Sequence, residues 1–167
     1  MGFIDDDDDF EDEDEDENFA VENRLSTISN SFNIEALILA WQDPSADNLY
    51  YFDTASGALK LVNQNLYDLR ELTDELEKNK ERYLYLPKPD ANQLKNDLKD
   101  FQKGLEDENL RKILDMAFES PHIWDSFKVI LKSEERIKAL EDFRRARTCL
   151  RIRQWMEANA MAGKFQF

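Results

Sequence analysis

The sequence predicts an α+β fold: a mostly helical single domain with a small antiparallel β-hairpin and a disordered acidic N-terminal tail. Three observations lead to this prediction. Two short β-prone runs flank a turn-forming segment in the first half of the chain. Apolar residues recur at helical spacing through most of the second half. A run of acidic residues, with too little apolar surface to form a core, stands near the start.

The acidic run extends from Asp5 to Glu17, where twelve of thirteen residues are Asp or Glu and Phe10 is the exception. It carries most of the net charge of −15, because residues 1–22 contain thirteen acids and no Lys or Arg, which leaves 24 acids against 22 bases elsewhere. Repulsion between like charges predicts disorder here. The predicted division of the chain is a tail and linker at 1–31, a single domain at 32–160 and a C-terminal extension at 161–167.

A short helix is expected to open the domain. Asn33 is suited to cap it, because Asn side chains accept hydrogen bonds from the first free N–H groups of a helix. The helix should end before Pro44. One of its faces is apolar and comprises Ile34, Leu37, Ile38 and Trp41.

A β-hairpin is expected at about residues 48–63. The β-prone runs 49–52 and 58–62 are separated by a segment that begins with Asp53 and ends with Gly57. An Asp can accept hydrogen bonds from the turn, and a Gly can adopt positive φ without strain. A third extended segment is expected just before Pro87, because proline biases the preceding residue toward extended backbone. Between hairpin and third segment, an amphipathic helix is marked by Leu69, Leu72 and Leu76.

Helices are expected from about residue 90 to residue 158. Asp90 with Gln93 resembles a capping box at the start of the first. Apolar stripes mark the first helix at Leu94, Leu98, Phe101 and Leu105 and the second over residues 110–118. Similar stripes mark the third over residues 123–131 and the last at Leu140, Phe143, Ala146 and Leu150. Ser120, followed by a proline in the first turn, should cap a third helix, and Ser133 should cap the last.

Composition favours a soluble cytoplasmic protein. Cys149 is the single cysteine, so the printed chain cannot form an internal disulfide, and a reducing compartment is expected. The polyanionic start differs from the positively charged start of a secretory signal. The longest apolar run, residues 36–41, is far shorter than the roughly 20 residues of a membrane-spanning helix.

Several short motifs, taken in order, resemble those of a widespread bacterial family. They are Tyr50-Tyr51-Phe52-Asp53, Ser56-Gly57, Glu81-Arg82-Tyr83-Leu84, Pro87, Phe127-Lys128 and Trp155. This order is similar to that of uncharacterised protein family zero-one-five-eight over roughly residues 33–159. Phe52 and Ser56 stand where Leu and Thr are usual. The family has no established activity, so the resemblance implies a fold and no mechanism.

The family-motif positions admit two interpretations. They are Tyr51, Asp53, Gly57, Arg82, Tyr83 and Pro87. The functional interpretation is a ligand or partner site near the hairpin. The structural interpretation, which we prefer, is a contact between Arg82 and Asp53, with tyrosines filling the seam between sheet and helix.

An arginine stripe in the last helix is the strongest candidate for a partner- or anion-contact face. Arg144, Arg147 and Arg151 fall within about 60° of one another at helical spacing, and Trp155 lies one turn further on. Arginine side chains bind carboxylates and phosphates, often through two hydrogen bonds. Acids of neighbouring helices could equally well pair with them. Both interpretations remain open at the level of sequence.

No catalytic, metal or cofactor constellation is visible in the sequence. His122 is the single histidine and has no second metal-ligating side chain at a suitable spacing. Cys149 lacks a nearby base that would activate it as a nucleophile. The sequence therefore predicts a non-enzymatic protein without a cofactor.

Two functional hypotheses follow. The first is a protein-interaction or regulatory module whose acidic tail modulates the arginine face. The alternative is a nucleic-acid-associated protein, or a mimic of the phosphate backbone. The near balance of charge outside the tail speaks against nucleic-acid binding, because such proteins usually carry a basic excess. A protein partner is expected, and no membrane association.

Overall fold

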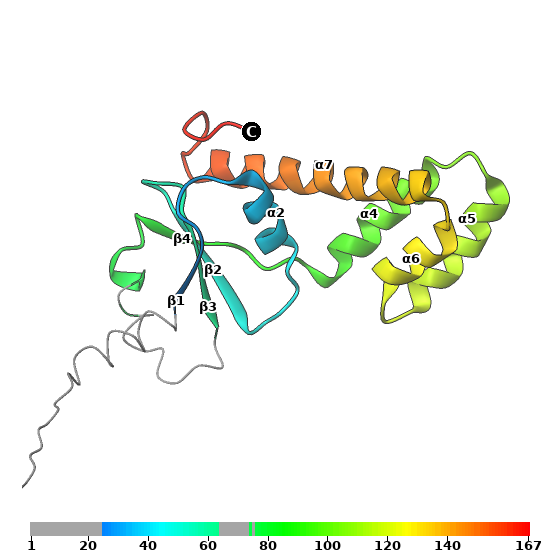
Figure 1. The fold of residues 1–167 in the computed structure, drawn as a ribbon, viewed down its shortest axis with the longest axis horizontal. Helices are drawn as coiled ribbons and strands as arrows, with labels where there is room; N and C mark the ends of the chain where they lie inside the picture. Colours follow the sequence, from blue (N-terminus) through cyan, green and yellow to red (C-terminus); the bar gives the residue numbers. More distant parts are fainter. Residues whose placement is uncertain (1–24, 64–73, 75) are drawn as a thin grey trace, which may run out of the picture. The chain divides into compact units, whose positions relative to one another are not determined.

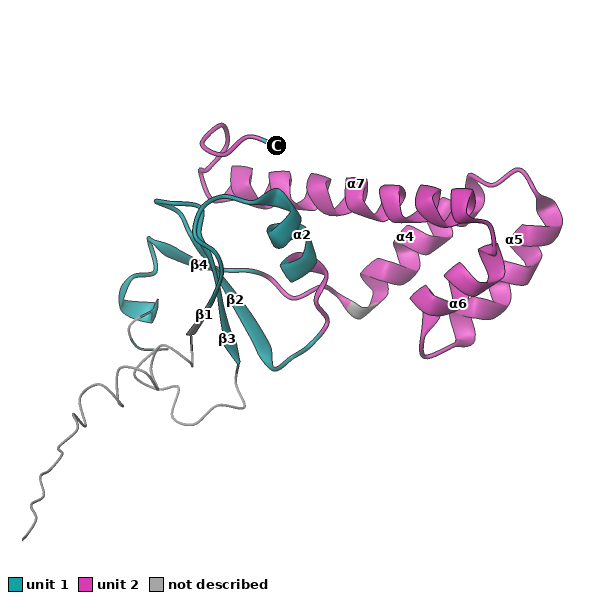
Figure 2. Cartoon of the chain, in the orientation of Figure 1, with its two compact units in different colours: residues 1–40, 45–86, 167 teal, residues 41–44, 87–166 magenta. Residues whose placement is uncertain are grey.

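The computed structural model describes residues 25–63, 74 and 76–167. These residues form two compact units, shown in Figures 1 and 2. The sheet unit contains the described residues up to Leu86, except 41–44, together with Phe167. The helical unit contains residues 41–44 and 87–166. The sequence predicted one domain over 32–160, whereas the structure groups this range into two units.

The sheet unit is built on an antiparallel sheet with the strand order β1–β3–β2–β4. The strands are β1 (Leu25–Ser29), β2 (Asn48–Asp53), β3 (Leu59–Asn63) and β4 (Tyr83–Tyr85). The predicted hairpin is formed by β2 and β3, with Phe52 opposite Leu59. Phe52, Leu59 and Val62 are buried, so the hairpin supplies the apolar interior of this unit.

Strand β1 corrects the sequence analysis, which assigned residues 25–29 to the linker. It pairs with β3, with Leu25 opposite Val62, and its register shifts after Thr27. β1 lies at the edge of the sheet, where a strand pairs through its backbone on one side and polar side chains are tolerated. Its serines and threonine therefore offered no apolar alternation by which the strand could be recognised.

Helix α2 (Ile34–Gln42) begins at the predicted cap. The Asn33 Oδ1 atom accepts hydrogen bonds from the backbone N–H groups of Glu35 and Ala36, at 3.0 and 3.2 Å. Leu37, Ile38 and Trp41 are buried, as the apolar face predicted. Residues 41 and 42 are grouped with the helical unit, so α2 contributes to both units.

The helical unit consists of helices packed around one apolar core (Figure 2). They are α4 (Ala91–Lys103), α5 (Glu108–Asp115), the short 3-10 helix η1 (Met116–Glu119), α6 (Ile123–Leu131) and α7 (Glu134–Ala158). The buried core residues are Leu98, Phe101, Leu110, Leu114, Ala117, Ile123, Phe127, Leu131 and Leu140. These are the apolar stripes that the sequence predicted.

In the helical unit, two helix caps agree with the sequence and a third differs. Asp90 accepts from the N–H of Asn92, and Ser133 accepts from that of Arg136. Ser120 accepts from the N–H of His122, but residues 121 and 122 form a turn and α6 begins only at Ile123. The proline after Ser120 therefore stands in this turn and not inside the helix.

The C-terminal extension, residues 161–167, makes contacts with the residues that precede it. The Met161 N–H donates to the Met156 C=O at 2.8 Å, and Ala160 adopts a φ of 59°, which together form a Schellman-type end of α7. Met161 is buried. Within the sheet unit, the Phe167 ring packs on the Phe32 ring with centroids 5.7 Å apart.

Some predicted features lie outside the described residues. They are the disordered acidic tail and most of the amphipathic helix marked by Leu69 and Leu72. Residues 76–78 are helical, and Leu76 is buried. Within the described part of the chain, no helix combines the length and apolar character needed to cross a membrane.

Candidate functional site

The family-motif residue Asp53 is a buried carboxylate at the end of β2. Its oxygens accept hydrogen bonds from the N–H of Ala55 at 2.9 Å and from the Ser56 hydroxyl at 2.9 Å. The Arg82 guanidinium donates to the same carboxylate at 3.1 to 3.3 Å. The Thr54 N–H donates to the Arg82 C=O at 2.7 Å, so backbone and side chain both tie the turn to the segment before β4.

These contacts set the protonation state of Asp53. Burial alone would raise the pKa of its carboxyl group, but the hydrogen bonds from Arg82, Ala55 and Ser56 outweigh burial and lower the pKa to about 2. The Asp53 carboxylate is therefore charged across the physiological range. With its oxygens occupied by protein donors, it serves to hold the turn.

The remaining motif residues surround this carboxylate or complete the sheet. Gly57 has a φ of 79°, a value that favours glycine in the turn. The Lys60 ammonium group and the Arg82 guanidinium each lie 5.2 Å from the centre of the Tyr83 ring. The Tyr51 ring packs on that of Tyr85 across β2 and β4, and burial raises the pKa of its hydroxyl. Pro87 follows Leu86, whose N–H donates to the Tyr50 C=O.

The structure therefore brings the motif residues together as a clamp on the sheet. Asp53, Gly57, Arg82 and Tyr83 meet at one turn, and the expected Arg82–Asp53 contact is present. The Asp53 carboxylate and the Nε and Nη2 atoms of Arg82 are used for local structure. This arrangement supports the structural interpretation of these positions.

The arginine face of α7 is occupied in large part by acids from α4. Arg151 donates to both oxygens of Asp97, at 2.5 and 2.7 Å. Arg147 lies 3.1 Å from the Asp100 carboxylate. Asp97 is only 4% exposed, so the Arg151–Asp97 pair is an internal contact between the two helices.

Arg144 and Trp155 complete the predicted face, and both contact aromatic rings. The Arg144 guanidinium lies 4.5 Å from the centre of the Trp124 ring, and burial lowers the pKa of Arg144. No acid among the described residues forms an ion pair with it. The Trp155 ring packs edge-on against that of Trp41, with centroids 5.4 Å apart. Of the three arginines of the predicted face, Arg144 is thus the one without an ion pair in the described chain, although the charge of Asp97 acts on it.

The two remaining candidate residues from the sequence are His122 and Cys149. His122 is exposed in the turn before α6, and Cys149 is buried on α7. Among the described residues, no three His, Cys, Asp or Glu side chains are grouped so that they could hold a metal ion.

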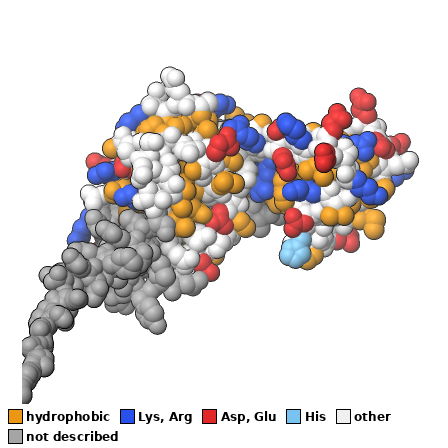
Figure 3. Space-filling view, in the orientation of Figure 1, with side chains coloured by type: hydrophobic (Ala, Val, Ile, Leu, Met, Phe, Trp, Pro, Cys, Tyr) orange, Lys and Arg blue, Asp and Glu red, His pale blue; other side chains and the backbone are white. Residues whose placement is uncertain are grey.

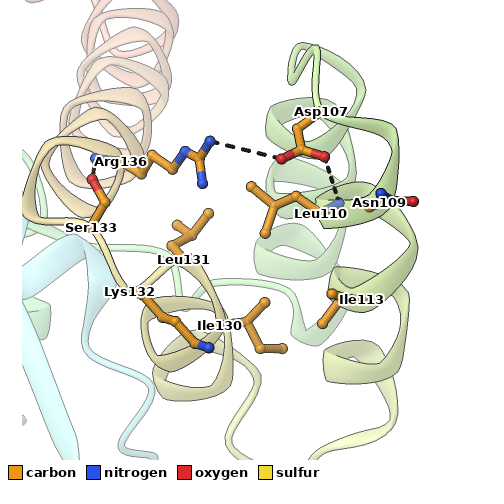
Figure 4. Close-up of a pocket in the computed structure, with 9 residues that line it drawn as sticks. All are labelled: Asp107, Asn109, Leu110, Ile113, Ile130, Leu131, Lys132, Ser133 and Arg136. Carbon is orange, nitrogen blue, oxygen red and sulfur yellow. Dashed lines mark hydrogen bonds and ion pairs between the residues drawn. The ribbon is translucent and has the colours of Figure 1, made fainter.

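Sequence reasoning missed a groove of about 410 Å³ in the helical unit. Its walls come from α5, from the end of α6 and from the start of α7 (Figure 4). Leu110, Ile113, Ile130 and Leu131 form an apolar floor. The polar rim comprises Asp107, Asn109, Lys132, Ser133 and Arg136. Only tertiary packing brings these segments together, and the sequence analysis counted Ile113 among the apolar residues of a helix stripe and not as part of a groove.

Comparison with known proteins identifies the family and no individual relative. No curated protein and no solved structure matches the chain. The model of one family, described as Uncharacterised protein family (UPF0158), matches residues 23–167. The acidic run lies before the matched region, whereas the clamp, the arginine face and the groove all lie within it. The chain belongs to the uncharacterised protein family UPF0158.

Proposed function

We propose that this protein is a non-catalytic protein-interaction module that binds its partner through the helical unit. The observation that carries the proposal is the groove between α5, α6 and α7, with its apolar floor and charged rim. Peptide segments commonly bind in grooves of this composition, where apolar anchors supply affinity and the rim supplies orientation.

Exposed apolar side chains next to the groove support a macromolecular partner. Ile113 is 50% exposed, Met116 is 73% exposed and Val129 is 72% exposed. Met116 follows Ile113 by three residues, which places both on one side of the α5–η1 segment. Apolar surface that extends beyond a cavity is typical of an interaction site.

The test is site-directed photo-crosslinking in cells that express the protein. A photo-reactive amino acid at position 116 should crosslink a protein, and the additional substitution Ile113→Asp should abolish this product. The same photo-reactive group at position 150 serves as the control, because Leu150 is also an exposed apolar residue, 50% exposed against 73% for Met116, and lies on α7 outside the groove lining. Crosslinks of equal yield from both positions, or insensitivity to Ile113→Asp, would refute the proposal.

The regulatory part of the proposal concerns the acidic run. We propose that residues 5–17 compete with an anionic partner for cations of the helical unit. Its twelve carboxylates act at a range that salt shortens, so the competition is an electrostatic effect. The cations available for this competition include the exposed Lys132 and Arg136, and Arg144, whose guanidinium packs on the Trp124 ring.

Nucleic-acid binding has weaker support than protein binding. Arg147 and Arg151 already contact acids of α4, which leaves few donors of the predicted face for phosphates. On the face shown in Figure 3, Lys and Arg side chains of the helical unit are interspersed with Asp and Glu. Filter binding at low salt, with and without residues 5–17, tests this alternative. Salt-sensitive retention of DNA or RNA by the shortened protein would favour it over the protein-interaction proposal.

A further inference from the structure

We propose that the groove recognises a partner peptide in which apolar side chains are flanked by carboxylates. This inference rests on the proposed function and adds the chemistry of the partner. The groove is defined as the surface of Asp107, Asn109, Leu110, Ile113, Ile130, Leu131, Lys132, Ser133 and Arg136. The apolar floor and the charged rim of the groove each support one part of this inference.

The floor selects apolar side chains. Leu110 is 7% exposed and Leu131 is 1% exposed, so both belong to the core and present a small apolar surface at the base of the groove. Ile113 of α5 and Ile130 of α6 form the two sides of this floor (Figure 4). Water in this space contacts aliphatic carbon, and an apolar side chain that displaces it gains the free energy of burial.

The rim places two cations at separate ends of this floor. In Figure 4, Arg136 extends toward Asp107 at one end, whereas the Lys132 ammonium group lies beside Ile130 at the other. Both side chains are exposed. A peptide lying along the floor therefore meets a cation on each side of its apolar residues. Carboxylates that flank those residues would complement both cations.

Asp107, the acidic residue of the rim, leaves the guanidinium group of Arg136 available to a partner carboxylate. The Arg136 Nη2 atom lies 3.9 Å from the Asp107 Oδ2 atom, which is beyond hydrogen-bond distance. The other oxygen of Asp107 accepts from the Leu110 N–H at 3.1 Å and caps α5. Asp107 is thus committed to its helix. A partner carboxylate can approach Arg136 closely without removing that cap.

The backbone holds Lys132 at the groove despite a conformational cost. Lys132 has a φ of 61° and a ψ of −38°, and the Ser133 N–H donates across it to the Leu131 C=O at 2.6 Å. This three-residue turn is strained for a residue that has a side chain. Glycine would adopt the same turn more easily, yet the residue at this position is a lysine whose ammonium group reaches the rim.

Helix ends strengthen the preference for carboxylates. Asp107 caps the N-terminus of α5 and Ser133 caps that of α7, and both residues line the groove. The N-terminal end of a helix carries partial positive charge, which favours a nearby anion. The two ends act together with Lys132 and Arg136 and do not form a site alone.

The experiment uses the full chain and two synthetic peptides of twelve residues. Both carry Leu or Ile at every third or fourth position; one has Glu at the remaining positions and the other has Lys. Isothermal calorimetry or fluorescence anisotropy should show binding of the Glu peptide and no comparable binding of the Lys peptide. Lys132→Gln and Arg136→Gln should each weaken the Glu peptide by about 2- to 5-fold, the effect of losing one exposed ion pair. Ile113→Asp should weaken it by roughly tenfold or more.

Matched variants separate the groove from the rest of the surface. Lys138→Gln removes an exposed cation on α7 outside the groove, and Leu150→Asp matches Ile113→Asp in exposure. Neither should change the affinity. Equal binding of both peptides, or equal effects of the groove variants and their controls, would overturn the inference.

The outcomes also distinguish this inference from the proposed function. If crosslinking at position 116 depends on Ile113 but the Glu peptide does not bind, then the proposed protein-interaction function stands and the proposed chemistry of the partner is wrong. If the Glu peptide binds with the predicted sensitivity but crosslinking yields no protein, then the groove chemistry stands and the proposed cellular role falls.

Discussion

Asp53 shows how one residue of the family pattern acts through local structure. A buried carboxylate is costly unless hydrogen bonds and a counter-charge compensate for its lost hydration. Here backbone, hydroxyl and guanidinium donors all converge on it. The Asp53 carboxylate consequently links the β2–β3 turn to Arg82 in front of β4.

This linkage predicts a pH-dependent stability. The pKa of Asp53 in the folded protein, about 2, is below its ordinary value of 3.8, so the carboxylate contributes stability above pH 4 and loses it as the pH falls toward 2. Asp53→Asn should therefore lower the free energy of unfolding by about 1–2 kcal/mol at pH 7 and by little at pH 2. Urea unfolding followed by far-UV circular dichroism measures both values. Asp100→Asn, at a half-exposed pair, is the control; an Asp53→Asn effect independent of pH would contradict the assignment.

Two non-glycine residues with positive φ allow the cost of a strained backbone to be compared with a role in peptide binding. Lys132 and Ala160 have φ values of 61° and 59°. Glycine at either position should raise the free energy of unfolding by about 0.5–1 kcal/mol, because it removes the side-chain clash of this conformation. Thermal unfolding measures that change. Lys132→Gly should also weaken the Glu peptide, whereas Ala160→Gly should not; identical peptide affinities for the two variants would show that Lys132 has no role in binding.

At the scale of elements, the contact between α4 and α7 depends on two ion pairs of different burial. Arg151–Asp97 is bidentate and largely enclosed, whereas Arg147–Asp100 is about 40% exposed at both side chains. Removal of one member of an enclosed pair leaves the other charge without a partner. The exposed pair loses little, because water solvates the remaining group.

We expect the alanine substitutions of Asp97 and Asp100 to differ strongly in their effect on the free energy of unfolding. Asp97→Ala should lower the free energy of unfolding by about 3 kcal/mol, and Asp100→Ala by less than about 1 kcal/mol. Chemical denaturation followed by tryptophan fluorescence is suited to this comparison, because Trp124 and Trp155 lie in the same unit. The double variant Asp97→Leu with Arg151→Met should recover part of the loss. Equal effects of both alanine substitutions would mean that Asp97 is solvated in solution.

The sequence predicted the elements whose signals are local. Asn33 and Ser133 cap their helices as expected, and the Asp53–Gly57 turn lies between the predicted strands. Each of these features depends on a side chain and its immediate neighbours. Pairing of the α7 arginines with acids of neighbouring helices was one of the two interpretations that the sequence left open. The acidic partners could not be named, because helix spacing does not specify which helix packs alongside.

Features that depend on tertiary context escaped the sequence analysis. Strand β1 is recognised through its pairing with β3, since an edge strand of serines and threonine has no apolar pattern. The groove arises because the strained turn at Lys132 brings α7 back beside the α5 cap at Asp107. No propensity predicts a lysine with positive φ. The groove therefore could not be inferred before the packing was known.

At the scale of the whole molecule, the acidic run is separate from the family pattern. The family match begins at residue 23, whereas the run ends at Glu17. Residues 23–167 are nearly neutral, with 24 acids and 22 bases. The run also contains Phe10 between acidic residues, so it carries the same combination of carboxylates and an apolar side chain that we propose for the partner peptide.

This similarity predicts that the run competes with the partner. Deletion of residues 5–17 should increase the affinity of the full-length protein for the Glu peptide, and the increase should be greatest at low salt. At about 0.1 M salt the screening length is about 10 Å, and at 1 M it is about 3 Å, so the affinities of the two proteins should converge as salt is added. Replacement of the twelve acids by Asn and Gln should reproduce the deletion, since charge and not chain length is the cause. Equal affinities at low salt would refute the competition, and a difference that persists at 1 M salt would assign it to Phe10 and not to the carboxylates.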